Sequence, residues 1–536
     1  MPVELESADE SDTESGHSFR MHISKFRVRT SHTRFCIGYA LALFVICNAI
    51  NIDKLAKWFR QGEGLDYFAL AAYLAAGLCL FIVVFTLFAH RLTLKPLAIL
   101  LTLASAAATY FISKYGVAID TSMVRNTVHT DPTEVGQLLS VQMIPYLVFL
   151  MILPTLLILA ADITFEASGR YLLGSLKVIG VVLGIALACL GVEYQAIFRA
   201  GNVSNKYIVY SLVPINIISS SVNVATKAVR PYFAKTQKDI AFTAKVKQPT
   251  NLVVVLAVGE SSRRKNFSLY GYTRRNTNPE LQRIDGLHLL DAVATRASTL
   301  YALPMILEKK GIKLTTVTSR AGVPTTCIVN YTLYDNCAAV GEIKVSDCAH
   351  GGKCYDEDVI PLLKKNLATY SSGSRFVVLH LGGGSHGPLY LDRHPPEFQQ
   401  FKPMCTDADV ANKCSLEELY NSYDNTLLYV DHVVSDTIHA LDASGVPYVF
   451  IYLSDHGESL LENGMLFHGV PPGVAVPAEQ ADIPLIVKSS VPITIEKRAT
   501  YQQGDVYDSV LDLLSIESPE LDRAGKFIET EGPARQ

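Results

Sequence analysis

Two carboxylates and three histidines are the side chains of this 536-residue chain best suited to hold a metal ion. They are Glu260, His386, Asp455, His456 and His468. Zinc accepts both carboxylate oxygen and imidazole nitrogen as ligands. Each of these residues alone is more often a turn, cap or hydrogen-bonded loop residue than a ligand. The sequence therefore predicts a zinc site only if the fold brings them together.

A zinc site of this type also needs a group to activate, and we expect a hydroxyl because the cysteines of the same region look paired. Ser298 and Thr299 stand at the expected start of a helix, within Ala297–Pro304. A hydroxyl in that place can bind metal as an alkoxide, and the positive end of the helix dipole favours its negative charge. Ordinary capping of the helix by either hydroxyl is the competing interpretation.

Three apolar runs can position the candidate ligands. They are Leu252–Val258, Phe376–His380 and Tyr448–Leu453. Each is continuous, as expected of a strand buried on both faces, and helical patterns such as Leu416–Ser435 lie between them. Strands that alternate with helices predict a mainly parallel sheet. Because ligands of such sheets bind beyond the carboxyl ends of the strands, we expect the candidate residues to converge at that edge.

The first 200 residues have a different character. The whole chain is 49% hydrophobic and only 18% charged, and the apolar excess is concentrated in five runs. These are Phe35–Ile50, Tyr67–Ala89, Pro96–Ile112, Ile144–Ala161 and Tyr171–Leu190. Each spans or nearly spans a bilayer, which needs about 20 residues. The sequence predicts a five-helix transmembrane domain, and a net charge of −4 argues against a general nucleic-acid binder.

The basic residues predict the orientation of these spans. Five of them precede the first run, namely Arg20, Lys25, Arg27, Arg29 and Arg34. They favour a cytoplasmic N-terminus, so five spans leave the C-terminal part outside the cytoplasm. A cleaved signal peptide is the alternative for the first run, but no small-residue cleavage site follows it and further spans do.

The ten cysteines test that orientation. Four lie in the apolar runs as expected buried thiols, and six lie in polar loops of the C-terminal part. These six form close pairs along the chain, namely Cys327 and Cys337, Cys348 and Cys354, and Cys405 and Cys414. An even number in close pairs suits an oxidising compartment, with local pairing the simplest connectivity. A zinc cluster is the alternative, although no C-x2-C spacing occurs.

Taken together, the motifs resemble those of the phosphoethanolamine transferases. They are Gly259-Glu260-Ser261, Asn266–Tyr272 with Asn278-Pro279, Ser385–Pro388, Tyr423–Thr426, and Ser454–Ser459 with His468-Gly469. The resemblance covers nearly the whole chain after an N-terminal tail. This family modifies lipid A or lipopolysaccharide and includes the mobile colistin-resistance enzymes.

The resemblance implies a fold, a reaction and a location. The expected fold is an α-helical transmembrane domain of five spans followed by an α/β domain of the alkaline-phosphatase/sulfatase-like class. The expected reaction transfers phosphoethanolamine from phosphatidylethanolamine to lipid A or lipopolysaccharide through a covalent intermediate on a threonine. The expected location is the bacterial inner membrane, with the catalytic domain in the periplasm. The expected domains are a disordered cytoplasmic tail (1–33), the transmembrane domain (34–200), an interfacial bridging helix and linker (201–247) and the catalytic domain (248–536).

The resemblance also assigns roles to single residues. The zinc ligands it implies are Glu260, Thr299, Asp455 and His456, with Thr299 also the covalent carrier. His386 and His468 match histidines that hold phosphate or a second zinc. In the membrane half, Asn126, Thr130 and Glu134 match residues thought to bind the lipid head group, and their four-residue spacing would put them on one face of a helix.

Three other functions remain open from the sequence. The acceptor can be a periplasmic glucan or another glycan, or the chain can be a phosphatase- or sulfatase-type hydrolase of the same fold. Sulfatases, however, need a Cys or Ser in a C/S-x-P-x-R context, which this chain lacks. A catalytically decayed membrane scaffold is the third possibility. The short segment Pro304–Ile312 favours it, and the intact Glu260, Asp455 and His456 argue against it.

Overall fold

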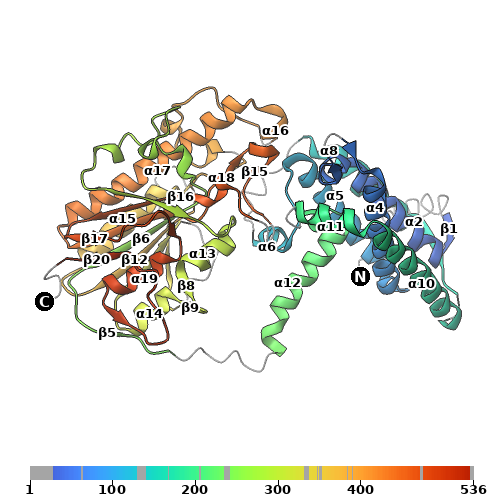
Figure 1. The fold of residues 1–536 in the computed structure, drawn as a ribbon, viewed down its shortest axis with the longest axis horizontal. Coiled ribbons are helices and arrows are strands. Elements are labelled where there is room, and N and C mark those ends of the chain that lie inside the picture. The colour runs from blue at the N-terminus through green and yellow to red at the C-terminus, as the bar shows by residue number, and fades with distance from the viewer. Residues whose placement is uncertain are drawn as a thin grey trace, which may run out of the picture. The chain divides into compact units, whose positions relative to one another are not determined.

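The protein is described by a computed structural model that covers residues 28–531. Gaps lie at 62–63, 130–140, 167, 204–206, 234–241, 331–336, 338, 347, 349–352, 383, 389, 408 and 471–474. The chain forms two compact units. A helical unit contains mainly the residues up to Ser113 and Val141–Val222, and an α/β unit contains mainly Asn223–Gln536 (Figure 1).

Among the residues that the structure describes, five helices are long and apolar enough to cross a membrane, which agrees with the predicted number. They cover His32–Ile50 (α2), Tyr67–Phe88 (α4), Leu94–Tyr115 (α5), Met143–Ala160 (α8, η3 and α9) and Arg170–Val192 (within α10, Ser168–Val192). The fourth is not a uniform α-helix, because Leu147–Ile152 (η3) is π-helical between α8 (Met143–Tyr146) and α9 (Leu153–Ala160). Pro154 follows this segment and cannot donate a backbone hydrogen bond within the helix.

Shorter elements connect or flank these helices. They are β1 (Val28–Ser31), α3 (Ile52–Ala56), β2 (Arg60–Gln61), β3 (Gly64–Leu65), α6 (Thr121–His129), β4 (Ala161–Thr164), α11 (Tyr194–Val203), η4 (Tyr207–Tyr210) and α12 (Ile215–Phe233). The strands β1 and β4 pair in parallel, which fastens the residues before α2 to those after α9.

An eight-stranded sheet forms the centre of the α/β unit. Its strand order is β11-β10-β12-β6-β13-β16-β7-β18. The bounds are Glu342–Lys344, Thr325–Val329, Arg375–Leu381, Val253–Gly259, Tyr448–Ser454, Asp482–Ser489, His288–Val293 and Tyr501–Gln502, in that order. Only β16 among these strands runs antiparallel to its neighbours, so the sheet is mainly parallel, as predicted.

The three predicted strands are neighbours at the middle of this sheet. In the register of β12, β6 and β13, Leu381 lies opposite Gly259, and Gly259 lies opposite Ser454. All three strands are parallel, so their carboxyl ends meet at one edge. The sequence motifs that follow them are therefore brought to the same side of the sheet.

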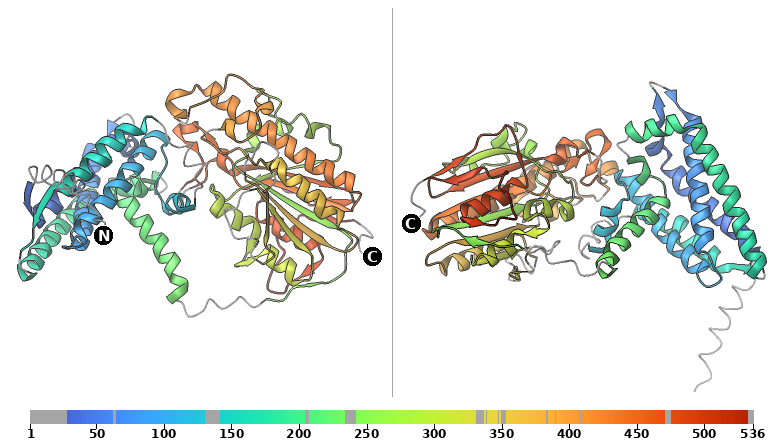
Figure 2. Two further views of the ribbon diagram at one scale, coloured as in Figure 1. Left: turned by 180° about the vertical axis from the view of Figure 1, so that it is seen from behind. Right: turned by 60° about the horizontal axis from the view of Figure 1, so that its bottom comes forward.

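Helices cover both faces of the sheet (Figure 1 and Figure 2). On one face lie α15 (Val359–Ala368) and α17 (Leu416–Ser444), and on the other lie α13 (Thr299–Leu307), α14 (Leu314–Arg320) and α19 (Asp505–Leu513). Alternate residues of β6, such as Val254 and Leu256, pack with α13, α14 and α19 in a buried apolar core. Two short α-helices, α16 (Val410–Lys413) and α18 (Ala478–Ala481), also lie in the described part of this unit.

Small two-stranded sheets complete the unit. They pair β8 (Glu308–Lys309) with β9 (Ile312–Lys313), β14 (Ser459–Leu460) with β15 (Leu466–Phe467), β17 (Ile493–Ile495) with β20 (Ile528–Thr530), and β5 (Lys245–Val246) with β19 (Ile516–Glu517). The β8–β9 hairpin occupies the short segment after Pro304, and β14–β15 folds the chain back between His456 and His468.

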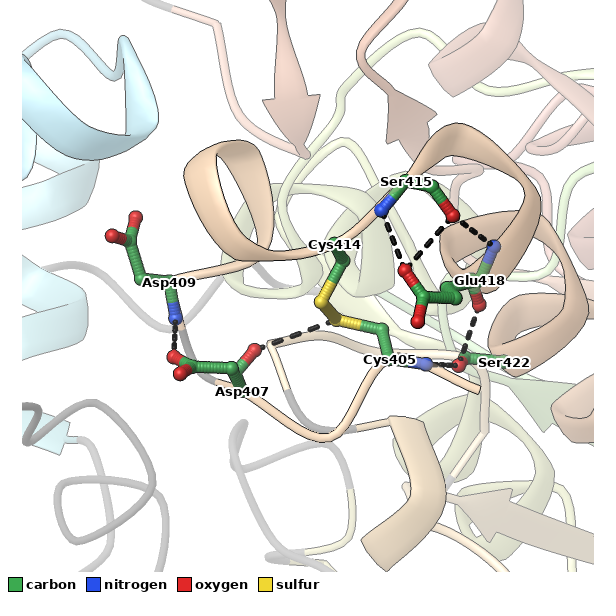
Figure 3. Close-up of a disulfide and its surroundings, with 7 residues drawn as sticks. All are labelled: Cys405, Asp407, Asp409, Cys414, Ser415, Glu418 and Ser422. Atoms are coloured by element: carbon green, nitrogen blue, oxygen red, sulfur yellow. Dashed lines mark hydrogen bonds between the residues drawn. A yellow bond between two sulfur atoms is a disulfide. The ribbon is translucent and has the colours of Figure 1, made fainter. Parts of the chain in front are cut away.

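The three predicted disulfides are present. They join Cys327 to Cys337, Cys348 to Cys354, and Cys405 to Cys414. The last of them closes a loop at the start of α17 (Figure 3). There Ser415 caps the helix in a reciprocal capping box with Glu418, and the Cys405 amide donates to Ser422 Oγ at 2.8 Å. The disulfide therefore ties the incoming loop to the first two turns of the helix.

Candidate active site

The carboxyl ends of β6 and β13 bring two buried carboxylates and a buried histidine together. Glu260 follows β6, and Asp455 and His456 follow β13. All three are at most 2% exposed. His456 Nε2 lies 3.5 Å from Glu260 Oε1 and 3.3 Å from Asp455 Oδ2. These three sequence-predicted residues thus form one cluster.

Thr299 joins this cluster from α13. It is the first residue of the helix, and its hydroxyl donates a hydrogen bond to Glu260 Oε2 at 2.8 Å. The hydroxyl oxygen of Thr299, Oγ1, also lies 3.3 Å from His456 Nε2. Ser298 occupies the cap position but makes no capping hydrogen bond with its side chain. The capping interpretation is therefore wrong for Thr299, whose hydroxyl faces the carboxylates.

The tautomer of His456 follows from its second nitrogen. Nδ1 lies 2.9 Å from the carbonyl oxygen of Gly457, which can only accept, so Nδ1 carries the proton. The lone pair of neutral His456 is then on Nε2, which faces Thr299, Glu260 and Asp455. A backbone carbonyl that fixes the ring in this way is the usual support of a metal-binding histidine.

The electrostatics of the cluster favour a cation. Burial and the neighbouring Glu260 charge raise the pKa of Asp455. Burial also opposes ionisation of Glu260, but His456, His386 and His468, when protonated, and a hydrogen bond from Ser261 outweigh it and lower the pKa of Glu260. Asp455 Oδ2 is buried and accepts no hydrogen bond from any residue that the structure describes. A buried acceptor without a donor, beside a second carboxylate and an imidazole nitrogen, fits a divalent cation.

His386 and His468 lie beside this cluster. The rings of His456 and His468 have centroids 4.3 Å apart, and those of His386 and His468 are 4.6 Å apart. Single donor atoms of Glu260, His456 and His468 all lie within 4.8 Å of one another, and so do those of His386, Glu458 and His468. The fold therefore brings all six predicted residues of the α/β unit into one region.

Glu458 is a residue of this region to which the sequence analysis gave no role. It is fully buried, and its Oε2 lies 2.8 Å from His468 Nδ1. Its other oxygen accepts from Gly387 N at 3.2 Å and from the Tyr390 hydroxyl at 3.1 Å. Glu458 thus orients His468 with Nε2 toward the cluster and links it to the segment that carries His386. In the sequence, only its position two residues after His456 indicated that Glu458 could lie in this region.

Close backbone packing sets the position of the His386 segment. The Ser385 amide donates to the Glu260 carbonyl oxygen at 2.9 Å, and the Gly384 amide donates to Asp356 Oδ2 at 2.9 Å. A Cβ on Gly384 would overlap the Glu260 carbonyl oxygen. Glycine is therefore required where this loop passes over the end of β6.

The loop after Glu260 is held from α17. The Tyr423 hydroxyl donates to the Ser261 carbonyl oxygen at 2.8 Å and accepts from the Arg263 amide at 2.8 Å. The fully buried Arg263 guanidinium donates to the Glu458 carbonyl oxygen and to Glu462 Oε1. Tyr423 of the Tyr423–Thr426 motif therefore supports the Glu260 loop.

The predicted head-group residues lie outside this description. Thr130 and Glu134 belong to the undescribed segment 130–140. For Asn126 only the backbone is described, as part of α6.

Two family models match the chain. The one described as "Phosphoethanolamine transferase EptA/EptB" matches residues 77–229, and the one described as "Sulfatase" matches residues 295–516. The second match agrees with the mainly parallel sheet and its helices on both faces, so the α/β unit is sulfatase-like.

Known relatives cover most of the chain. Phosphoethanolamine transferase EptA of Escherichia coli K12 is 30% identical over 491 residues, which is 81% of this chain and 85% of the relative. Phosphatidylethanolamine transferase Mcr-1 of Escherichia coli is 28% identical over 85% of this chain and 90% of the relative. Among solved structures, the chain is similar to the integral membrane protein lipooligosaccharide phosphoethanolamine transferase A (EptA) of Neisseria meningitidis. The two are 26% identical, and the match covers 91% of this chain and 96% of that one, with a TM-score of 0.79. With this extent of similarity and the five apolar helices before a sulfatase-like unit, the chain belongs to the phosphoethanolamine transferase family.

Proposed function

We propose that this chain transfers phosphoethanolamine from phosphatidylethanolamine to lipid A or to the lipopolysaccharide core, through a phosphoethanolamine group held covalently on Thr299. The observation that carries the proposal is the buried Thr299 hydroxyl, 2.8 Å from Glu260 Oε2 and 3.3 Å from His456 Nε2. A hydroxyl with an adjacent base, in a cluster suited to a cation, has what a covalent nucleophile needs.

We further propose Glu260, Thr299, Asp455 and His456 as the ligands of a zinc ion. Two carboxylates, a hydroxyl and an imidazole with its Nε2 lone pair toward the cluster make a donor set that zinc accepts. When bound, zinc would lower the pKa of the Thr299 hydroxyl and polarise the phosphate of the donor. Asp455 Oδ2 is buried without a hydrogen-bond donor among the described residues, which supports the assignment of Asp455 as a ligand.

In the first half of the reaction, Thr299 Oγ1 attacks phosphorus, and the bond from phosphorus to the diacylglycerol oxygen breaks. The Thr299 hydroxyl already donates to Glu260 Oε2, so this carboxylate is in position to accept the proton and return it to the leaving oxygen. His386 and His468 hold the phosphate oxygens and neutralise the charge that develops on them. Glu458 keeps His468 in the orientation this role needs.

In the second half, an oxygen of the acceptor attacks the phosphorus carried by Thr299, and the bond from phosphorus to Thr299 Oγ1 breaks. The proton of the attacking acceptor group passes to Glu260 and from there to Thr299 Oγ1. The acceptor is a phosphate or hydroxyl group of lipid A or of the core sugars. The product carries an ethanolamine cation on an anionic glycolipid, which weakens its attraction for cationic peptides such as polymyxins.

We place the helical unit in the bacterial inner membrane and the α/β unit in the periplasm. The five apolar helices, the basic residues before α2 and the three disulfides of the α/β unit support this orientation. Asn126, Thr130 and Glu134 are proposed to bind the lipid head group, from the segment around α6.

Mass spectrometry of lipid A and core oligosaccharide tests this function. Cells that carry the wild-type chain should show phosphoethanolamine on one of the two, and cells with the Thr299→Ala variant should not. The purified full chain should contain about one zinc ion. Modification of a periplasmic glucan alone would make the acceptor wrong. Release of free phosphoethanolamine with no acceptor modified would identify a hydrolase.

A further inference from the structure

A cavity of about 710 Å3 lies in the helical unit, whereas the catalytic cluster lies in the α/β unit. Its walls come from the α4–α5 connection and the start of α5 (His90–Lys95), from the end of α9 with β4 and the residues just after it (Leu159–Glu166), and from the start of α10 near Tyr171. Each wall contains or adjoins the end of a helix that is long and apolar enough to cross a membrane. The cavity therefore lies at the depth of lipid head groups.

The cavity is at the end of the helical unit where the first span begins. His32, in the first turn of α2, lies with its Nε2 2.7 Å from the carbonyl oxygen of Ala89, the residue before this wall. Under the proposed orientation this is the cytoplasmic end, so the lipids that reach it belong to the inner leaflet. The transfer reaction proposed above takes place on the other side of the membrane.

Side chains of opposite charge line different walls of the cavity. Arg91 and Lys95 line the α4–α5 wall, and Asp162 and Glu166 line the wall formed by β4 and the residues after it. Within the described part of the chain, no ion pair joins either cation to either carboxylate, and Arg91 and Glu166 make no hydrogen bond or ion pair at all. The lining itself therefore carries two cations and two carboxylates, which are not paired with one another.

Lys95 and Asp162, the other two charged residues of the lining, can still bind a ligand. Lys95 Nζ donates to the Leu159 carbonyl oxygen at 3.0 Å, which uses one of its three donors. Asp162 Oδ2 lies 3.3 Å from Arg29 Nε, in a pair whose side chains are 39% and 84% exposed. Such an exposed pair is weak, so the carboxylate remains available.

The walls are held in place before any ligand binds. The parallel pairing of β1 with β4 fixes the wall that carries Asp162. The Tyr171 hydroxyl lies 3.1 Å from His90 Nδ1 and donates to the Ala89 carbonyl oxygen at 3.2 Å, which ties the start of α10 to the α4–α5 connection. A pre-formed cavity loses less conformational entropy on binding than a flexible one.

We propose that this cavity is a binding site for the head group of a zwitterionic phospholipid with a primary ammonium, the phosphatidylethanolamine class. Arg91 and Lys95 bind the phosphate, and Glu166 and Asp162 bind the ammonium through N–H donors. Apolar side chains of the lining, such as Leu94 and Phe165, contact the glycerol and the first acyl carbons. A choline head group has no N–H to give the carboxylates, and an anionic lipid leaves both carboxylates facing its negative charge.

Native mass spectrometry of the full chain in detergent tests the proposal. The Thr299→Ala background is used so that no lipid is consumed. Because the active site proposed above also takes phosphatidylethanolamine, binding at the cavity is read as the part of the affinity that the cavity variants below change. The delipidated chain is titrated with phosphatidylethanolamine, phosphatidylcholine and phosphatidylglycerol. We expect phosphatidylethanolamine to bind about tenfold more tightly than the other two.

Two variants of opposite effect locate the site. Arg91→Gln should weaken binding of phosphatidylethanolamine about tenfold, because the phosphate loses a charged partner. Glu166→Gln leaves the cavity net positive and should reverse the preference, so that phosphatidylglycerol binds better than phosphatidylethanolamine. Arg170→Gln removes an exposed cation at the same end of α10 that does not line the cavity, and it should change neither affinity.

The opposite results overturn the proposal. These are an unchanged phosphatidylethanolamine affinity in both Arg91→Gln and Glu166→Gln, an equal loss in Arg170→Gln, or a preference of the parent chain for phosphatidylglycerol. Elution of each variant as the same single species on size exclusion establishes that a lost affinity is not a folding defect.

Discussion

At the scale of single residues, the candidate site depends on how two of its histidines are oriented by neighbouring groups. Gly457 fixes His456 through its carbonyl oxygen, and Glu458 fixes His468 through its carboxylate. Both partners lie in the same short motif as His456. The proposed chemistry therefore depends on a segment of a few residues after β13, and the contacts of that segment with distant parts of the chain decide where the rings point.

Replacing Glu458 with Gln tests the orientation of His468. The amide keeps the size of the side chain but has only one acceptor oxygen for its three present partners, and it removes the negative charge beside the imidazole. Loss of such an orienting partner typically costs about 10- to 100-fold in activity. We expect transfer by Glu458→Gln to fall by this factor in a lipid A modification assay.

The control for this variant is Glu496→Gln, which removes a surface carboxylate paired with Arg498 and should leave transfer unchanged. Equal activity of Glu458→Gln and the wild type would show that His468 needs no orienting carboxylate.

Part of this residue-scale picture was predictable and part was not. Glu260, Asp455 and His456 could be identified because each follows an apolar strand whose carboxyl end faces the same edge of the sheet. The direction of the Thr299 hydroxyl could not, because it depends on a carboxylate 39 positions earlier in the chain. The contacts of Glu458 could not be predicted either, because they require the β14–β15 hairpin to fold His468 back over it.

At the scale of elements, α17 organises much of the α/β unit. Its predicted extent was Leu416–Ser435, but it continues to Ser444 and ends with Gly445 in the left-handed conformation. No residue before Gly445 interrupts the helix, so that glycine was the better signal for its end.

In the helical unit, the number of spans could be predicted from the apolar runs alone. The π-helical segment η3 could not, because its residues show no distinct periodicity in the sequence.

The Cys405–Cys414 disulfide should stabilise the start of α17. It closes a loop with a sequence separation of 9, for which loop entropy predicts a contribution of about 2–3 kcal/mol. The double variant Cys405→Ser and Cys414→Ser should lose about this free energy of unfolding in denaturant titrations followed by circular dichroism. Cys189→Ser, at a cysteine outside the disulfides, should not. Equal stability of both variants would show that the capping box alone holds this end.

Asp431 should make the stability of the α/β unit depend on pH. It is buried in α17 and accepts hydrogen bonds from the Glu280 and Leu281 amides, at 2.8 and 3.1 Å. Burial, which these bonds offset only in part, raises the pKa of Asp431 to about 7. A carboxyl whose folded pKa lies above its unfolded value contributes stability below the unfolded pKa, and this contribution is lost as the pH rises through about 7.

The Asp431→Asn variant removes that titration. Between pH 5 and pH 8 its free energy of unfolding should therefore fall by roughly 2–3 kcal/mol less than that of the wild type. Calorimetric unfolding of the full chain at the two pH values measures the difference. Glu417→Gln, at an exposed carboxylate in the first turn of the same helix, should keep the wild-type slope. Parallel slopes for the wild type and Asp431→Asn would contradict the buried, protonated carboxyl.

At the scale of the whole molecule, the chain joins five apolar helices to a sulfatase-like unit, and relatives match both parts. The composition of the first 200 residues predicted this division, because the apolar excess there is too large for a soluble domain. The short segment after Pro304 had favoured a decayed enzyme. In the structure, it forms the β8–β9 hairpin after α13, and Thr299 still contacts Glu260.

The most direct test of the proposed mechanism is intact-protein mass spectrometry of the full chain after incubation with phosphatidylethanolamine and no acceptor. The wild type should gain the mass of one phosphoethanolamine group, and peptide sequencing should locate it on Thr299. Ser298→Ala should gain the same mass, whereas Thr299→Ala should gain none. An adduct that persists in Thr299→Ala, or a wild-type chain that modifies lipid A without ever forming an adduct, would contradict the covalent role of Thr299.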